Sequence, residues 1–173
     1  MKPVYRLFAG AAAIAVAAAI VSMGSAKADS EQRDALLGSW RLVPEKSTFA
    51  LGSSPFHRLT LKFSATGGGV KEDAQGTDSD GRSINAEYTI IADGKYYPVT
   101  GDADFDSSSY TRVNDRTTVY VRRKFGMSVV AGSRMLSRDG KTLSFREETV
   151  DSDGRETGSA LLVFEKVSSA PGT

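Results

Sequence analysis

The sequence predicts an all-β protein: an antiparallel up-and-down β-barrel of about ten strands, preceded by a short helix. Three observations lead to this prediction. Apolar and polar residues alternate with a period of two in many short segments, Asp-Gly pairs punctuate these segments, and helical periodicity is scarce. A β-sandwich is the alternative architecture.

Residues 1–28 have the features of a secretory signal peptide. A positively charged start with Lys2 and Arg6 precedes an uncharged, Ala-rich run, and an Ala-x-Ala pattern ends at Ala28. We therefore predict cleavage after this residue and a single mature domain over 29–173. The alternative is that the apolar run is retained as an anchor, since its length is at the short edge of a membrane span.

Composition limits the compartment and the partners. The chain of 173 residues has 22 Lys and Arg, 21 Asp and Glu, and no Cys. The predicted signal segment carries three of the basic residues and no acidic one, so the mature domain has 19 basic and 21 acidic residues, a net charge of −2. This balance excludes a strongly basic nucleic-acid binder. We expect a bacterial protein exported to the periplasm or the exterior, without a membrane partner after cleavage.

The mature chain divides into one short helix and ten strands. The helix is predicted near residues 31–37, after a capping Asp or Ser. No segment is long enough for the crossover helices that parallel strands need, so the short connections indicate an antiparallel meander. A meander of this size tends to close and thereby remove its exposed edges. The predicted strands run over 40–43, 58–64, 70–77, 83–91, 96–100, 108–113, 117–123, 128–137, 142–150 and 159–167.

Tight turns are expected at the four Asp-Gly pairs, because both positions of such a turn tolerate positive φ. The residues 78–82 recur unchanged as 151–155, which we attribute to the requirements of the same turn rather than to duplication of a hairpin. Residues 67–69 and 114–116 are predicted as further turns, and 168–173 as a loose tail. The Asp-Gly pairs are Asp80-Gly81, Asp93-Gly94, Asp139-Gly140 and Asp153-Gly154.

The first predicted strand carries a Gly-x-Trp motif, Gly38-Ser39-Trp40, after a short helical turn. Together with the closing strand over 162–166, it resembles the calycin group of lipocalins and intracellular fatty-acid-binding proteins, and the chain looks like exported bacterial lipocalin-like proteins. The resemblance implies that Trp40 packs across the closed end of the barrel as a structural plug. The Arg-x-Tyr positions that hold a carboxylate in fatty-acid-binding proteins fall on Leu162 and Phe164, so fatty-acid specificity is not implied.

The candidate ligand-binding residues are chosen from the alternate positions of each predicted strand that are expected to point into the barrel. Leu162 and Phe164 are expected to line the barrel, and Phe63 and Tyr88 share the apolar parity of their own strands. A basic side chain that points into the barrel could pair with an anionic ligand, because a buried guanidinium needs a partner. Arg122 and Arg146 are the candidates for this role.

No pattern for catalysis or metal binding is evident. His57 is the only histidine, there is no Cys nucleophile, and no Gly-x-Ser-x-Gly motif is present. The repeated Asp-Ser-Asp-Gly turns lack the later carboxylate of a calcium loop. Asp102, Asp104 and Asp106 are expected to be solvated loop charges. We therefore predict no enzyme, no metal and no cofactor.

The predicted function is that of an exported lipocalin-like protein that binds a small, mostly apolar ligand. Barrels of about eight strands are filled by their own side chains, whereas a barrel of about ten should leave space. The alternative is a non-enzymatic structural or protein-interaction barrel with a filled interior. The sequence leaves the ligand and the oligomeric state open.

Overall fold

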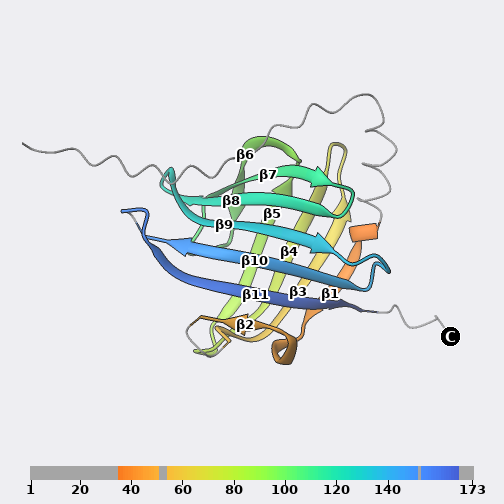
Figure 1. Cartoon of the computed structure of the whole chain (residues 1–173), viewed down its shortest axis with the longest axis horizontal. Coiled ribbons are helices and arrows are strands. Elements are labelled where there is room, and N and C mark those ends of the chain that lie inside the picture. Colours follow the sequence, from red (N-terminus) through yellow and green to blue (C-terminus); the bar gives the residue numbers. More distant parts are fainter. Residues whose placement is uncertain (1–34, 51–53, 152, 168–173) are drawn as a thin grey trace, which may run out of the picture.

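The computed structural model describes residues 35–50, 54–151 and 153–167, which form one antiparallel sheet (Figure 1). The signal segment over 1–28 and the tail over 168–173 lie outside the described residues, as does most of the helix predicted near 31–37. A 3-10 turn, η1 (Pro44–Lys46), separates the first two strands. The strands are β1 (Gly38–Leu42), β2 (Thr48–Phe49), β3 (Phe56–Ala65), β4 (Val70–Asp78), β5 (Ser83–Ile90), β6 (Asp93–Thr100), β7 (Ser107–Asn114), β8 (Thr117–Lys124), β9 (Met127–Leu136), β10 (Thr142–Val150) and β11 (Glu156–Lys166).

The sheet closes into a barrel because β1 pairs with β3 on one side and with β11 on the other. Trp40 on β1 lies opposite Leu61 on β3 and opposite Lys166 on β11. The strands from β3 to β11 each pair with the next along the chain, so that ten strands complete the circuit. The short β2 adds a second pairing to β11, with Phe49 opposite Ala160. The ten-strand barrel is confirmed, and the sandwich is not formed.

Because neighbouring strands run antiparallel, their connections alternate between the two ends of the barrel (Figure 1). We call one end the open end; it carries the β4–β5, β6–β7, β8–β9 and β10–β11 connections, on the left of the picture. The other end, which we call the Trp40 end, carries the β3–β4, β5–β6, β7–β8 and β9–β10 connections.

Apolar packing fills the Trp40 end. Trp40 is wholly buried, and its indole N–H donates a hydrogen bond of 2.8 Å to the carbonyl of Leu36. The Lys166 ammonium lies 5.1 Å from the centre of the indole ring. Leu143 and Phe164 are buried in the same core. A large ring with its one polar group satisfied contributes burial area here without an unpaired donor.

The two copies of the repeated pentapeptide form the same turn. Asp78 Oδ1 accepts hydrogen bonds from the backbone N–H groups of Asp80 and Arg82, and Asp151 Oδ1 accepts the equivalent pair from Asp153 and Arg155. The side-chain oxygens are thus used to fix the backbone. This geometry agrees with the interpretation that the repeat reflects the requirements of one turn type.

One of the expected Asp-Gly turns also forms part of a strand. Asp93 and Gly94 are the first residues of β6, and the register of β5 with β6, in which Tyr88 lies opposite Val99, centres the chain reversal on this pair. Asp93 Oδ1 accepts a local hydrogen bond from the backbone N–H of Lys95, Gly94 has a φ of 78°, and the pairing with β7 shifts register between Asp93 and Tyr96. The pair therefore turns the chain between β5 and β6, and it also begins the irregular pairing of β6 with β7.

In most strands the more apolar set of alternate residues faces the interior of the barrel, but in β8 it does not. Leu59, Leu61 and Phe63 on β3 are buried, as their alternation predicts. On β8, however, the inner residues are Thr118, Tyr120 and Arg122, and the valines between them face outward. The more apolar parity therefore does not mark the interior of this strand.

We predict that Trp40→Phe lowers the free energy of unfolding by about 1–3 kcal/mol, because it removes the hydrogen bond to Leu36 and part of the buried ring. Urea denaturation followed by far-ultraviolet circular dichroism measures the change. Arg41→Gln, at the neighbouring exposed position of the same strand, should stay within about 0.5 kcal/mol of the parent protein. Equal effects of the two variants would contradict the role of Trp40 as a structural plug.

Candidate functional site

Polar and charged side chains gather inside the barrel between its two ends. Glu72 on β4 and Arg134 on β9 are only 2% and 6% exposed. Arg122 on β8 and Glu147 on β10 have side chains that are 11% and 19% exposed. Since charged groups are rarely buried unless something compensates them, this region is the candidate functional site. We call it the lumenal polar cluster: Glu72, Arg122, Arg134 and Glu147, with Ser108 and the hydroxyls of Tyr88, Tyr110 and Tyr120.

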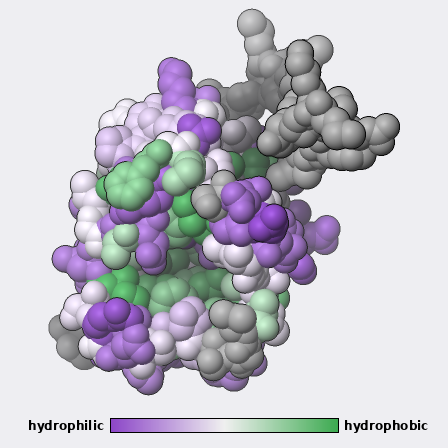
Figure 2. Space-filling model, turned by 90° about the vertical axis from the view of Figure 1, so that its left-hand side faces the viewer, coloured by the Kyte–Doolittle hydropathy of each residue, from purple (hydrophilic) through white to green (hydrophobic). Residues whose placement is uncertain are grey.

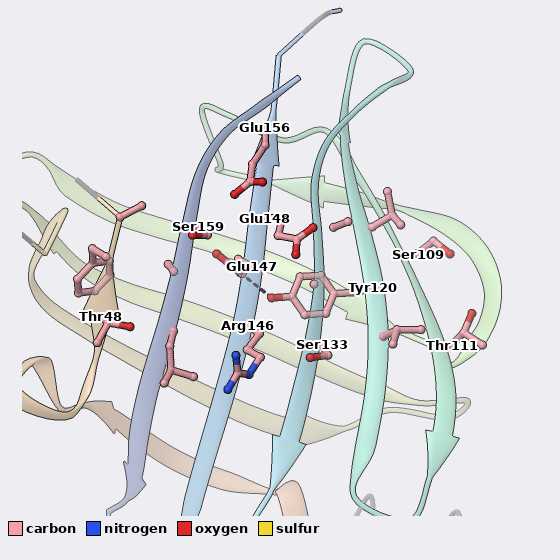
Figure 3. Close-up of a pocket in the computed structure, with 18 residues that line it drawn as sticks. Thr48, Ser109, Thr111, Tyr120, Ser133, Arg146, Glu147, Glu148, Glu156 and Ser159 are labelled. Atoms are coloured by element: carbon pink, nitrogen blue, oxygen red, sulfur yellow. Dashed lines mark hydrogen bonds between the residues drawn. The ribbon is translucent and has the colours of Figure 1, made fainter. Parts of the chain in front are cut away.

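Strand register builds one row of this cluster. Tyr120, Gly132 and Glu147 lie directly opposite one another on β8, β9 and β10. The hydroxyl of Tyr120 donates a 2.6 Å hydrogen bond to Glu147 Oε1 across the central glycine (Figure 3). A Cβ atom at Gly132 would lie 2.6 Å from Tyr120 Cζ. Only glycine therefore lets the tyrosine ring cross the middle strand to reach the carboxylate.

Arg122 occupies a cage of aromatic rings. Its Nη1 lies 3.1 Å from Glu147 Oε1, and its guanidinium carbon lies 4.9 Å from the ring centres of Tyr88 and Tyr120 and 5.3 Å from that of Phe105. Burial acts to lower the pKa of Arg122, but Glu147 and the tyrosines outweigh burial and raise it well above its ordinary value. The group is cationic, and its Nε has no hydrogen-bond partner among the described residues.

The β6–β7 connection ties the open end to the cluster. The hydroxyl of Tyr88 donates a short hydrogen bond to Asp102, and burial raises the pKa of Tyr88, so this residue remains a neutral donor. Phe105 contacts Arg122, and Asp106 Oδ2 accepts a 2.6 Å hydrogen bond from the backbone N–H of Phe125. The expectation that the aspartates here are merely solvated is therefore wrong for Asp102 and Asp106; Asp104 is exposed.

Glu72 and Arg134 face the interior without bonding to each other. Neither Glu72 Oε2 nor Arg134 Nη1 has a hydrogen-bond partner among the described residues, and no ion pair joins the two side chains there. Burial raises the pKa of Glu72, although Arg122 and Arg134 act against this rise. Burial likewise lowers the pKa of Arg134, with Glu72 opposing it. The hydroxyls of Ser108 and Tyr110 are also buried; they interact with each other but make no close hydrogen bond in the described part of the chain.

The open end gives a view into an apolar interior. Figure 2 looks onto this end, where a hollow with hydrophobic residues on its floor lies between polar rims. Several inner positions behind this end carry small side chains. Ala160 faces inward opposite Glu147, and Ala74 lies opposite Ala86 on the other wall. Small residues at facing positions leave more room than the aromatic residues of the Trp40 end.

The structure brings together most of the residues that the sequence singled out. Phe63, Tyr88, Leu162 and Phe164 are buried inside the barrel. Arg122 also points inward, within the cluster described above. His57 is exposed at the start of β3, as expected for a residue at a strand entrance.

Arg146 lies on the opposite face from the other candidates. It pairs with Ser133 and Leu161 at positions that point outward, so it cannot line the interior. Together with Val119 and Val121 it lines a groove of about 730 Å³ that crosses the outer face of β7 to β11 (Figure 3). The groove explains why the valines of β8 face outward.

Sequence reasoning missed Glu72, Arg134, Glu147 and Phe105. Glu72 and Glu147 share the parity of the apolar residues in their own strands: Glu72 alternates with Val70 and Ala74, for example. A charged residue on the apolar parity of a strand was therefore the available signal for the cluster. In β9 the opposite parity is the more apolar one, so Arg134 gave no such signal. Phe105 lies in an irregular loop, where no periodic signal exists.

Among the described residues there is no group of three or more His, Cys, Asp and Glu side chains arranged to hold a metal ion. In the same residues, no helix has both the length and the apolar character to cross a membrane.

Comparison with known proteins yields structural likeness only. No protein-family model matches the chain, and no curated protein matches it. A redesigned β-barrel, mFAP0, bound to DFHBI, is similar at 18% identity with a TM-score of 0.40, covering 76% of this chain and 99% of the barrel. A protein of unknown function of the DUF3598 family from Nostoc punctiforme is similar at 17% identity with a TM-score of 0.47. The match covers 78% of this chain and spans about half, 48%, of that protein.

Gly132→Ala should lower the free energy of unfolding by about 1–3 kcal/mol, because the new methyl group would overlap the Tyr120 ring and break its hydrogen bond to Glu147. Urea denaturation measures the loss. Gly158→Ala is the matched control, since a Cβ there meets nothing within 4 Å. It should be neutral or slightly stabilising. The interpretation fails if both alanines behave alike.

Glu72→Gln should stabilise the fold by an amount that grows with pH. Because burial raises the pKa of Glu72 above its unfolded value, the folded protein binds this proton more tightly than the unfolded chain. Protonated Glu72 therefore stabilises the folded protein. This stabilisation is fully present below the pKa of the glutamate in the unfolded chain, about 4.3, and is lost as the pH rises through the pKa of Glu72 in the folded protein. The glutamine variant does not undergo this loss.

Unfolding free energies of both proteins, measured between about pH 4 and pH 8, test this expectation. The difference, variant minus parent, should increase over the range. Glu148→Gln, which removes an exposed carboxylate from the outer face, serves as the control and should show no such increase. A difference for Glu72→Gln that is constant or falls with pH would contradict the assigned direction.

Proposed function

We propose that the barrel is a binding protein for one small, mostly apolar molecule that enters at the open end. The observation that carries this proposal is Arg122. Its buried guanidinium lies between the rings of Tyr88, Tyr120 and Phe105 and has one carboxylate partner, Glu147. Aromatic walls with a few placed polar groups are typical of small-molecule sites.

The small inner residues support the proposal. Ala74, Ala86 and Ala160 face the interior on two different walls. The hollow in Figure 2 lies at the same end of the barrel. An apolar molecule held there gains the free energy of burying its surface, about 25 cal/mol for each Å² removed from water.

The cellular setting of this function rests on the sequence. The signal segment over 1–28 supports export to the periplasm or the exterior, and the Gly38-Ser39-Trp40 motif supports a place among lipocalin-like calycins. The barrel would act by holding its ligand, with no chemical step. Binding of nucleic acid is not part of the proposal, given the net charge of the mature domain.

A second function is favoured by the packing of the Trp40 end. Trp40, Phe164 and Leu143 are almost wholly buried there, and Phe145 and Phe164 pack edge to face at 5.4 Å. If such packing extended through the whole interior, the protein would be a structural or protein-interaction barrel without a ligand. The two functions differ in whether the half near the open end admits a guest.

The test is titration with Nile red, an uncharged dye whose emission changes in apolar surroundings. The mature protein should give saturable binding that a lipid extract displaces. Ala160→Leu, which places a larger side chain on the inner wall, should weaken binding by about tenfold or more. Its neighbour Ser159 points outward, so Ser159→Leu should leave the affinity unchanged.

Circular dichroism shows whether both variants retain the fold. Saturable binding by the parent and by Ser159→Leu, with weak binding by a folded Ala160→Leu, supports a lumenal site. A folded parent protein that takes up no dye would favour the filled barrel instead.

A further inference from the structure

Glu72 and Arg134 are two buried, oppositely charged side chains that do not reach each other. Glu72 lies in the inner row with Phe63 and Tyr88, and Arg134 lies in the inner row with Thr118 and Phe145 on the other side of the barrel. The carboxylate keeps an unpaired acceptor, Oε2, and the guanidinium keeps an unpaired donor, Nη1, among the described residues.

Leaving both atoms unpaired is costly, since a buried polar atom without a partner loses its hydration with no replacement. Direct pairing is not formed, so a third group that bonds to both sides would satisfy them. Such a group must donate to the carboxylate and accept from the guanidinium at the same time. A methyl ether or an ester cannot do this, because it has no donor.

Two more buried hydroxyl groups lie on the inner face of β7. Ser108 and Tyr110 alternate on the inner face of β7, Ser108 nearer the open end and Tyr110 deeper inside. Their hydroxyls are buried and interact with each other, without a close hydrogen bond in the described residues. The Tyr110 ring lies 5.8 Å from the guanidinium carbon of Arg134. Buried polar groups therefore continue from Arg134 along the inner face of β7.

The charges of the lumenal polar cluster indicate whether the ligand group between Glu72 and Arg134 is charged or neutral. Arg122 is already paired with Glu147, and Arg134 faces Glu72, so two guanidinium groups meet two carboxylates. A ligand carboxylate would add a third acidic group beside Glu72 and Glu147, at a site where solvent does not screen the repulsion. An uncharged head group adds no such penalty.

We infer that the gap between Glu72 and Arg134 is the polar subsite of the lumen, and that it takes an uncharged head group with both a donor and an acceptor, an alcohol or a primary amide. This inference rests on the proposed binding function. It specifies which end of an amphipathic ligand enters first and excludes a simple carboxylate as the preferred head group.

A ligand series on the unmodified mature protein tests the inference. 1-Nonanol and 1-methoxyoctane are isomers that differ in the hydroxyl donor, and nonanoate adds the charge. In displacement of Nile red at about pH 8, nonanol should bind about tenfold more tightly than the ether, the ratio expected for one buried hydrogen bond. Nonanoate should bind more weakly than nonanol.

Variants locate the effect. Glu72→Leu combined with Arg134→Met replaces the pair with apolar residues, a change that folded proteins often tolerate. In this variant the alcohol and the ether should bind within about twofold of each other, because neither buried partner remains. Arg146→Met, on the outer face, is the matched control and should keep the preference of the parent protein.

The outcomes separate the inference from the function on which it rests. Absence of Nile red binding by the folded parent would remove the proposed function itself. Binding of the dye with equal affinities for nonanol and the ether would mean that only buried water bridges the gap, and this would overturn the inference alone. Tighter binding of nonanoate would overturn it as well. The parent series decides the question even if the double variant does not fold.

Discussion

Charge compensation inside a closed sheet is the interaction on which the rest of this structure depends. A guanidinium removed from water is tolerated only where carboxylates, hydrogen bonds or aromatic rings replace its hydration. Arg122 obtains all of these from three strands, β5, β8 and β10, and one loop. Arg134 obtains less, since its nearest recorded neighbours are the rings of Phe63 and Tyr110. The interior therefore has one satisfied cation and one that is only partly satisfied.

This requirement determines smaller features of the barrel. Gly132 is needed because Tyr120 must cross β9 to reach the carboxylate that neutralises Arg122. The β6–β7 connection is held down by Asp102 because Tyr88, beneath the guanidinium, directs its hydroxyl toward that loop. The half of the barrel near the open end is thus ordered by directional polar contacts, and the half around Trp40 by apolar packing. Polar contacts can exchange partners with a ligand, whereas a packed core cannot do so without losing contacts.

Local sequence signals predicted most of the fold. All ten long strands were expected from alternation and turn residues, and the structure extends several of them by two or three residues. The two-residue β2 is too short to show alternation. In β8 both parities are plausible, because Val119 and Val121 line an outer groove while Tyr120 and Arg122 face inward. Local pattern gives each strand's period, but the interior face also depends on its neighbours.

The candidate site was harder to predict because its contacts join residues that are far apart in sequence. Glu72 and Arg134 lie on β4 and β9, and only closure of the sheet by β1 and β11 places them in one interior. The diameter of a barrel grows with its strand number, so the distance across it is set by the whole circuit rather than by the reach of any side chain. In a narrower barrel of about eight strands, side chains on opposite walls would meet and fill the space. With ten strands Arg134 reaches across to the ring of Phe63, the residue opposite Glu72, yet forms no ion pair with Glu72 among the described residues.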